Sequence, residues 1–146
     1  MKLRTLILVL FLSIWSQELL AQLSVGYYPF QSTLSIATDT EKLIWADIRI
    51  EANSFYGNLN SELDLMWNWK RSDWVNYYSG LGWNFAPFAG ASDLDFTNGY
   101  VFATGARIKP WAAHRNFQVL FEVGPYVNRQ FDGGIFRTSL GLAYNW

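Results

Sequence analysis

The stretch LIWADIRIEAN, Leu43 to Asn53, decides the fold class of this chain. Side chains on a β-strand point alternately to two faces, with a period of two residues. Alternation divides this stretch into an apolar set (Ile44, Ala46, Ile48, Ile50, Ala52) and a polar set (Asp47, Arg49, Glu51, Asn53). A half-buried strand of a soluble protein shows this pattern, and so does a lipid-facing strand of a membrane barrel. The choice between them depends on the rest of the chain.

Five further segments divide in the same way: Asn58 to Arg71, Trp74 to Pro87, Gly99 to Lys109, Asn116 to Arg129 and Phe136 to Trp146. Their apolar faces are rich in large Trp, Phe, Tyr, Leu and Ile residues, and we expect no charge on any of them. Their opposite faces combine Gly, Ala, Ser and Asn with charged residues. This repetition predicts an all-β protein.

The composition of the two faces indicates which one points inward. The interior of an eight-stranded barrel has room only for close-packed side chains, and small residues beside long charged ones can fill it. The bulky apolar faces would then point outward, toward lipid. A soluble, lipocalin-like barrel would need the reverse arrangement, and its outer face would carry many small uncharged residues. The sequence favours the membrane barrel over this alternative.

The first 21 residues have the features of a cleaved secretory signal peptide. Lys2 and Arg4 form a positive region, Leu6 to Trp15 form an apolar region, and Ala21 ends a plausible cleavage site before Gln22. The apolar run is shorter than the ~20 residues that a membrane-spanning helix needs. We therefore expect a signal peptide at 1–21 and one domain at 22–146. The absence of cysteine excludes a disulfide framework and a lipid-anchored N-terminal Cys.

Overall composition is consistent with such a barrel. Aromatic residues make up 18% of the chain, and eight of them are Trp, which suits the aromatic girdles of outer-membrane barrels. The formal net charge is −1 and no basic stripe is present, so nucleic acid is not an expected partner.

Two shorter segments complete the strand count. Leu23 to Tyr28 and Thr33 to Asp39 also alternate, and Pro29 separates them. Eight strands is an even number, as a single-chain bacterial barrel requires. We expect periplasmic turns at Asp39 to Lys42, Ser72 to Asp73 and Pro110 to Arg115. We expect outward connections at Pro29 to Ser32, Ser54 to Gly57, Phe88 to Asn98 and Gln130 to Gly133. The prediction is a single eight-stranded antiparallel up-and-down transmembrane β-barrel with a porin-like fold.

Several stretches support a resemblance to a known group: YYPFQSTLSIAT, WADIRIEANSF with NLNSEL, KRSDWVNYYSGLG, and FEVGPYVN followed by FDGGIFRTSLGLAYNW. Through them the mature chain resembles the small outer-membrane β-barrel proteins common in Bacteroidetes. The resemblance implies a location in the outer membrane of a Gram-negative bacterium, in contact with its lipid. It also implies that the barrel-assembly machinery is a partner during biogenesis and reads a C-terminal signal made of Leu140, Leu142, Tyr144 and Trp146. Members of this group generally lack an assigned activity.

The sequence offers little catalytic chemistry. His114 is the only histidine and falls in an expected turn, without the further ligands that a metal site needs. Small barrels that remove acyl chains from lipid A pair a His with a nearby Ser, and none adjoins His114. Palmitoyl-transferring barrels use a His near the outer rim, where this chain has none. We therefore expect no enzymatic activity, no metal and no cofactor.

The predicted lumen contains the largest cluster of charged residues in the sequence. Alternation places five acids inside, Asp47, Glu51, Glu62, Asp64 and Glu122, with five bases, Arg49, Lys70, Arg107, Lys109 and Arg137. Because an unpaired buried ion costs several kcal/mol, we expect these charges to pair and to fill the lumen with Tyr78, Tyr126 and the Asn side chains. An ion or proton path through Glu62 and Asp64 is the alternative.

The favoured interpretation is a structural or accessory outer-membrane barrel without enzymatic activity. Another is a subunit that docks beside a larger outer-membrane complex through Trp67, Trp69, Trp74 and Trp83, although these residues also suit an ordinary interfacial girdle. A third is a surface binder that uses Phe88 to Asn98, where Asp93 and Asp95 suit a cation.

Overall fold

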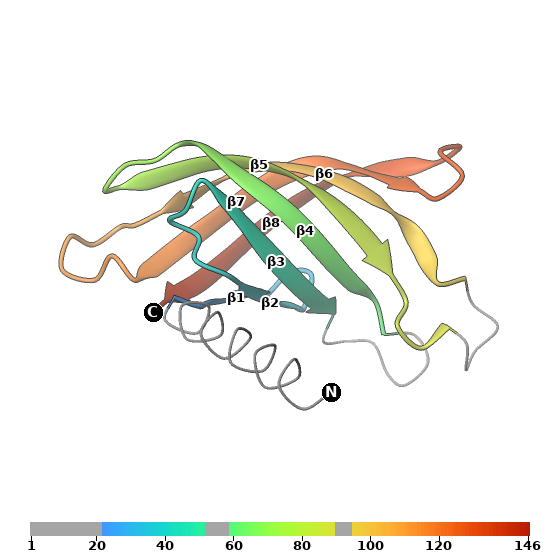
Figure 1. The fold of residues 1–146 in the computed structure, drawn as a ribbon, viewed down its shortest axis with the longest axis horizontal. Coiled ribbons are helices and arrows are strands. Elements are labelled where there is room, and N and C mark those ends of the chain that lie inside the picture. The colour runs from blue at the N-terminus through green and yellow to red at the C-terminus, as the bar shows by residue number, and fades with distance from the viewer. Residues whose placement is uncertain (1–21, 52–58, 90–94) are drawn as a thin grey trace, which may run out of the picture.

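The computed structural model describes residues 22–51, 59–89 and 95–146, and these form a closed antiparallel barrel (Figure 1). Its strands are β1 (Ser24–Tyr28), β2 (Thr33–Ala37), β3 (Ile44–Glu51), β4 (Ser61–Lys70), β5 (Val75–Phe85), β6 (Thr97–Ile108), β7 (Phe117–Asn128) and β8 (Gly134–Asn145). Each strand pairs with the next, and β8 pairs with β1 to close the barrel. The predicted all-β, eight-stranded, up-and-down architecture is confirmed. The predicted signal peptide and the predicted turn at Ser54 to Gly57 lie outside the described residues.

The register between strands sets the stagger of the barrel. A row of paired residues that starts at Val75 on β5 passes through β6, β7, β8, β1, β2, β3 and β4. It returns to β5 at Phe85, ten residues further along the strand. Eight strands with this stagger are tilted by roughly 40°, and they enclose a space that side chains can fill.

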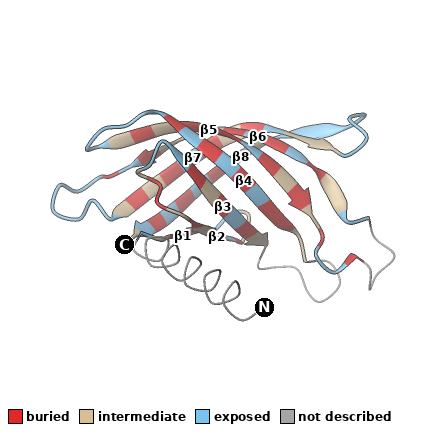
Figure 2. Ribbon diagram, in the orientation of Figure 1, coloured by how far each residue is buried: buried red, intermediate tan, exposed pale blue. Residues whose placement is uncertain are grey.

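The alternation in the sequence corresponds to alternation in burial (Figure 2). On β4, Asp64 and Met66 are buried, whereas Leu63 and Leu65 point outward and are exposed. Among the described residues, nineteen buried residues are polar or charged and only eleven are hydrophobic. The interior is therefore polar and the exterior is apolar, which is the reverse of an ordinary soluble domain.

One strand departs from strict alternation. The pairing of β4 with β5 shifts between Asn68 and Lys70, so that Lys70 lies opposite Tyr77. Such a bulge inserts one extra residue and reverses the facing of the residues that follow it. Lys70 is exposed, with its ammonium 6.0 Å from the centroid of the Tyr77 ring, and Trp69 stacks on the same ring. The prediction that Lys70 points into the lumen, and that the outer face carries no charge, is wrong at this position.

The connections define two ends of the barrel. The termini end carries the β2–β3, β4–β5 and β6–β7 connections (38–43, 71–74 and 109–116), together with the start of β1 and the end of β8. The loop end carries the β1–β2 and β7–β8 hairpins (29–32 and 129–133), the β5–β6 connection, and the end of β3. This division agrees with the expected turns, except that β6 begins at Thr97, inside the predicted loop Phe88 to Asn98.

The strands differ in length, and the wall is therefore uneven. β1 and β2 have five residues each, whereas β8 has twelve. β1 pairs with β8 only between Ser24–Tyr27 and Leu142–Asn145. Toward the loop end β8 continues past the β1–β2 hairpin (Figure 1), so within the described residues Gly134–Leu140 pairs with β7 alone. In the described ranges no helix is both long enough and apolar enough to cross a membrane.

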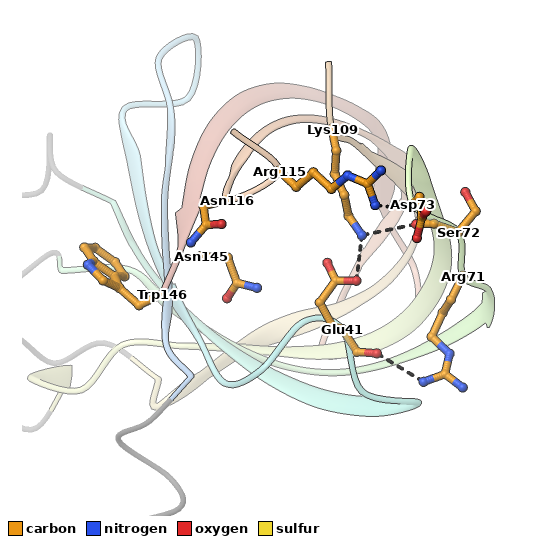
Figure 3. Close-up of a pocket in the computed structure, with 9 residues that line it drawn as sticks. All are labelled: Glu41, Arg71, Ser72, Asp73, Lys109, Arg115, Asn116, Asn145 and Trp146. Atoms are coloured by element: carbon orange, nitrogen blue, oxygen red, sulfur yellow. Dashed lines mark hydrogen bonds and ion pairs between the residues drawn. The ribbon is translucent and has the colours of Figure 1, made fainter. Parts of the chain in front are cut away.

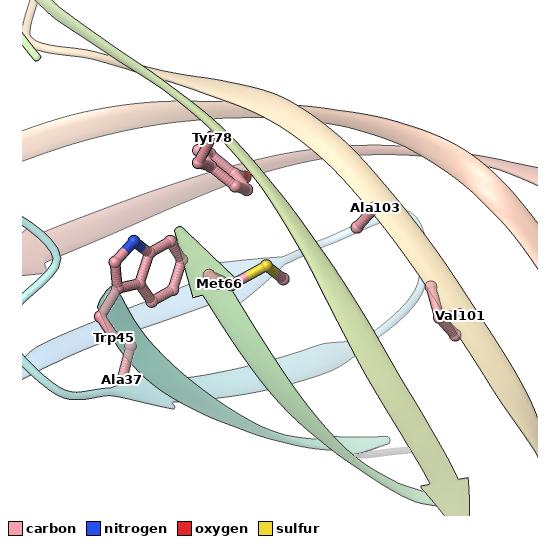
Figure 4. Close-up of a cluster of buried hydrophobic side chains, with 6 residues drawn as sticks. All are labelled: Ala37, Trp45, Met66, Tyr78, Val101 and Ala103. Carbon is pink, nitrogen blue, oxygen red and sulfur yellow. The ribbon is translucent and has the colours of Figure 1, made fainter. Parts of the chain in front are cut away.

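Large side chains close the middle of the barrel. Trp45 from β3 and Tyr78 from β5 meet edge to face at 5.3 Å between ring centroids, and Met66 packs in the same cluster (Figure 4). Inward-facing glycines make room for them, since a Cβ at Gly105 would lie 2.8 Å from the Tyr78 hydroxyl and one at Gly80 would lie 2.0 Å from the Met66 sulfur.

Candidate functional site in the charged lumen

Arg49 on β3 is the centre of the buried charge network. Its Nη1 and Nη2 bind the two oxygens of Glu122 on β7 at 2.7 and 2.8 Å, a bidentate pair that spans the lumen. Its Nε donates to Asp47 Oδ2 at 3.0 Å and also lies 3.0 Å from Asp64 Oδ2. Glu62 is a fourth carboxylate, 3.5 Å from Nη1. One guanidinium thus joins four carboxylates from three strands.

Neutral side chains complete this network. The Ser35 hydroxyl donates to Asp47 Oδ1 at 2.6 Å, and the Tyr78 hydroxyl donates to Glu122 Oε2 at 3.0 Å. Asp64 differs, because neither of its oxygens has a hydrogen-bond partner among the described residues. The single hydrogen of Arg49 Nε is directed at Asp47, so Asp64 gains a charge contact without a hydrogen bond.

Glu62 continues the network toward the loop end. Its Oε2 accepts from Arg137 Nη1 at 2.7 Å and from Asn84 Nδ2 at 3.4 Å. Glu51 lies half-buried at this mouth of the lumen, where it lines a space of only ≈ 10 Å³ with Thr33 and its neighbours. This part of the lumen is almost completely filled.

Arg107 on β6 is buried without a carboxylate partner among the described residues. Its guanidinium carbon lies 4.4 Å from the centroid of the Trp45 ring and 5.8 Å from that of Tyr78. Nη1 donates to Gln118 Oε1 at 3.2 Å and to Ser24 Oγ at 3.3 Å. The expectation that every lumen charge is ion-paired is therefore wrong for Arg107, where aromatic faces stabilise the cation.

A second network lies at the termini end, where the Glu41 carboxylate accepts from three side chains, of which Figure 3 draws Lys109. Lys109 Nζ donates to Glu41 Oε2 at 2.6 Å, Asn76 Nδ2 donates to the same oxygen at 2.9 Å, and Gln118 Nε2 donates to Oε1 at 3.2 Å. Lys109 also donates to the Ser72 carbonyl. Sequence reasoning missed Glu41, because it lies in a turn, where strand alternation gives no direction for a side chain.

Within the described residues, the lumen has an open recess at each end and a closed middle. The termini-end recess has a volume of ≈ 580 Å³ and is strongly charged, with Glu41, Arg71, Asp73, Lys109 and Arg115 in its wall. The loop-end recess has a volume of ≈ 480 Å³. The fully buried side chains of Tyr28, Trp45, Tyr78, Leu120 and Arg107 lie between them.

The ten residues predicted to form the lumen network fall into three groups. Glu51 lies at the loop-end mouth and Lys70 lies outside, as described above. The others point inward: Asp47, Arg49, Glu62, Asp64, Arg107, Lys109 and Glu122 are buried, and Arg137 is largely buried. Trp45 and Tyr28 are interior residues that were not predicted, although the parity of Trp45, two residues before Asp47, would have placed it inside.

The predicted C-terminal signal lies on the outer surface. Leu140, Leu142, Tyr144 and Trp146 are exposed on one face of the last strand and its end. The rings of Tyr144 and Trp146 meet edge to face at 5.0 Å, and the Trp146 amide donates to the Leu23 carbonyl. The recognition of these residues by assembly machinery stays a prediction.

The remaining candidate residues form no metal-binding cluster in the described part of the chain. His114 is exposed in the β6–β7 connection, and no group of three or more His, Cys, Asp or Glu residues in the described ranges is placed to hold a metal ion. Of the proposed cation ligands, Asp93 lies outside the described residues and Asp95 is paired with Arg129.

No protein-family model, no curated protein and no solved structure matches the chain. The function is therefore argued from the arrangement of its residues.

Proposed function

We propose that this protein is a non-enzymatic β-barrel of the Gram-negative outer membrane, with a charge-paired lumen that is closed to ions and a structural or accessory role. The observation that carries the proposal is the inversion of polarity: ion pairs are buried inside a wall whose outward side chains are apolar. A place among the small outer-membrane barrels of Bacteroidetes, which the sequence resembles, is part of the proposal.

The outer surface supports embedding in lipid. Leu65, Leu81, Phe102, Phe121 and Leu140 lie on five different strands, and each side chain is exposed. Continuous exposure of large apolar side chains around a barrel is unfavourable in water, whereas a bilayer requires it.

Aromatic residues gather near both ends of this apolar surface. The termini end has exposed Trp67, Trp69, Trp74, Trp111 and Trp146, and the loop end has exposed Phe96, Tyr100, Phe131 and Phe136. Two such girdles flanking an aliphatic band are typical of a barrel that spans a membrane. In the orientation that we propose, the termini end faces the periplasm and the loop end faces the outside of the cell.

Location and conductance test the proposal separately. The mature chain should begin at Gln22 and fractionate with the outer membrane, and recovery in the soluble periplasm would contradict the location. Purified protein in a planar bilayer should show no stable conductance steps, because bulky side chains close the middle of the lumen. Stable open-channel steps would instead favour the ion path through Glu62 and Asp64.

One observation favours a second candidate function, a docking subunit of a larger outer-membrane complex. Gly134–Leu140 of β8 extends past β1, and the Thr138 carbonyl on that side accepts from the Gln31 side chain at 2.6 Å. Backbone groups on an uncovered strand edge are costly in lipid, and a strand from a partner would satisfy them.

Photo-crosslinking in intact cells would test this second function. A crosslinking residue at Phe136, beside the extended edge, should give one defined product with another outer-membrane protein. The same residue at Leu63, on a strand paired on both sides, is the matched control. Equal labelling at both positions would contradict docking at β8.

A further inference from the structure

Amide side chains gather in the loop-end recess. We define the amide cup by Asn60, Asn84, Asn98, Tyr126 and Gln130, which line this space of ≈ 480 Å³. Asn84, Asn98 and Tyr126 lie on β5, β6 and β7, Asn60 immediately precedes β4, and Gln130 lies in the β7–β8 hairpin. The volume is in the range of pockets that bind small ligands.

Hydrogen bonds fix the amides in place. Asn98 Nδ2 donates to Asn60 Oδ1 at 3.0 Å and to Asn84 Oδ1 at 3.1 Å. Asn84 is buried, and its Nδ2 donates to Glu62 Oε2, which Arg137 also holds. The floor of the cup is thus connected to the lumen charge network and is ordered before any ligand arrives. Such preorganisation lowers the entropic cost of binding.

The described residues that line the loop-end recess have no net charge to offer a ligand. The charged residues among them are Asp95 and Arg129, and these pair with each other at 2.5 Å between Oδ1 and Nη1. The termini-end recess, of similar size, is instead lined by five charged residues. The contrast favours a neutral ligand for the cup over an anion or a metal ion.

The chemistry of the lining residues indicates the kind of neutral ligand. The Asn98 amide hydrogens are directed at Asn60 and Asn84, so the polar groups that remain for a ligand are the Asn98 oxygen, the Asn60 amide nitrogen and the Gln130 carboxamide. The Tyr126 phenol combines an apolar ring with a hydroxyl group. A saccharide hydroxyl both donates and accepts, and a sugar ring also has apolar faces. We propose that the amide cup binds a neutral saccharide, either a free oligosaccharide or the saccharide part of a surface glycolipid.

This inference goes beyond the proposed membrane role and is tested apart from it. Detergent-solubilised full-length mature protein would be applied to an array of neutral oligosaccharides of glucose, galactose, mannose and N-acetylglucosamine, with anionic oligosaccharides and purified lipopolysaccharide beside them. Calorimetric titration would then give the affinity for each ligand that binds. Conductance and membrane fractionation do not enter this experiment, so the two proposals can fail independently.

Two variants and a matched control assign binding to the cup. Asn98→Leu removes the bridging amide, and Gln130→Leu changes an exposed turn residue that is not needed for packing. Each should weaken binding about tenfold, because each removes a polar contact worth about 1.4 kcal/mol. Asn116→Leu changes an exposed asparagine in the wall of the termini-end recess and should leave the affinity unchanged.

Each outcome of the titration decides the proposal. Binding of a free neutral oligosaccharide that Gln130→Leu weakens supports it, and displacement of bound lipopolysaccharide by that oligosaccharide supports it with a glycolipid as the source. Binding only of anionic sugars or of lipopolysaccharide, which is itself anionic, binding unaffected by both variants, or no binding to any neutral oligosaccharide would overturn it.

Discussion

Arg49 shows how a single residue can hold the interior of this barrel together. Its guanidinium is the shared cation for Asp47, Asp64, Glu62 and Glu122, and all five side chains are almost completely buried. Arg49→Met would leave four carboxylates close together in the buried interior, so we expect a loss of about 3–5 kcal/mol in the free energy of unfolding. Urea unfolding in lipid vesicles would measure it.

Arg115 provides the control for Arg49. It pairs with Asp73 at 2.9 Å, but both side chains are well exposed at the termini end. Since exposed ion pairs contribute at most about 1 kcal/mol, Arg115→Met should have a small effect. Equal losses for the two variants would mean that the lumen network contributes little to stability.

The inward-facing glycines allow a second prediction about a single residue. A Cβ at Gly105 would lie 2.4 Å from the Phe121 carbonyl oxygen and 2.8 Å from the Tyr78 hydroxyl, which donates to Glu122. Gly105→Ala must therefore move backbone or displace Tyr78, and we expect a loss of roughly 1–3 kcal/mol. Gly133→Ala in the β7–β8 hairpin, where the nearest atom is 3.3 Å away, should cost clearly less in the same unfolding experiment.

At the scale of the strand, alternation in the sequence predicted much of what the structure contains. A period of two places Asp47, Arg49, Asp64 and Glu122 on the inner face without any knowledge of their partners. It could not predict that Arg49 reaches Glu122 across the lumen, because that contact depends on the stagger of the barrel. It also failed where the period is broken, at the β4 bulge before Lys70.

Strand β8 allows a prediction about a whole element. The Asn145 amide donates to Asn116, in the direction of β7, and the Trp146 amide donates to Leu23, in the direction of β1. Because β8 pairs with β7 in unbroken register, the amides of even-numbered residues face β1 throughout. Those of Phe136, Thr138 and Leu140 therefore point to the side where β8 extends past the short β1.

Hydrogen exchange measured by NMR on the isolated barrel should separate the two sets of amides. We expect fast exchange at Phe136, Thr138 and Leu140, and slow exchange at Arg137 and Ser139, whose amides face β7. Leu142, which faces β1 within the paired region, is the internal control and should be protected. Protection of all three edge amides in the isolated protein would mean that the chain itself covers the edge, which would remove the main support for docking at β8.

For the whole molecule, the central question is which solvent the outer face meets. Closure of eight strands is compatible with a lipid-embedded barrel and with a soluble one, so topology alone does not decide. The proposal that the outer face meets lipid rests on what the wall encloses: among the described residues, polar side chains outnumber apolar ones inside, and large apolar side chains are exposed outside. This inversion of polarity could be predicted from the composition of the two strand faces. The short β1–β2 hairpin and the amide cup could not, because they depend on the register between neighbouring strands.

Arg substitutions at two positions along the barrel axis test whether the outer face meets lipid. Leu65 in the middle of β4 is 60% exposed, and Ile44, the first residue of β3 at the termini end, is also 60% exposed. Both are aliphatic side chains on the outward face, and Ile44 pairs with Trp67, nearer the termini end than Leu65. In a bilayer, Arg costs roughly 2–4 kcal/mol near the midplane and about 0–1 kcal/mol near the interface. Leu65→Arg should therefore reduce the free energy of unfolding in lipid vesicles much more than Ile44→Arg. A soluble barrel has no such dependence on depth, so equal and small effects of the two substitutions would make the lipocalin-like alternative the better account of this chain.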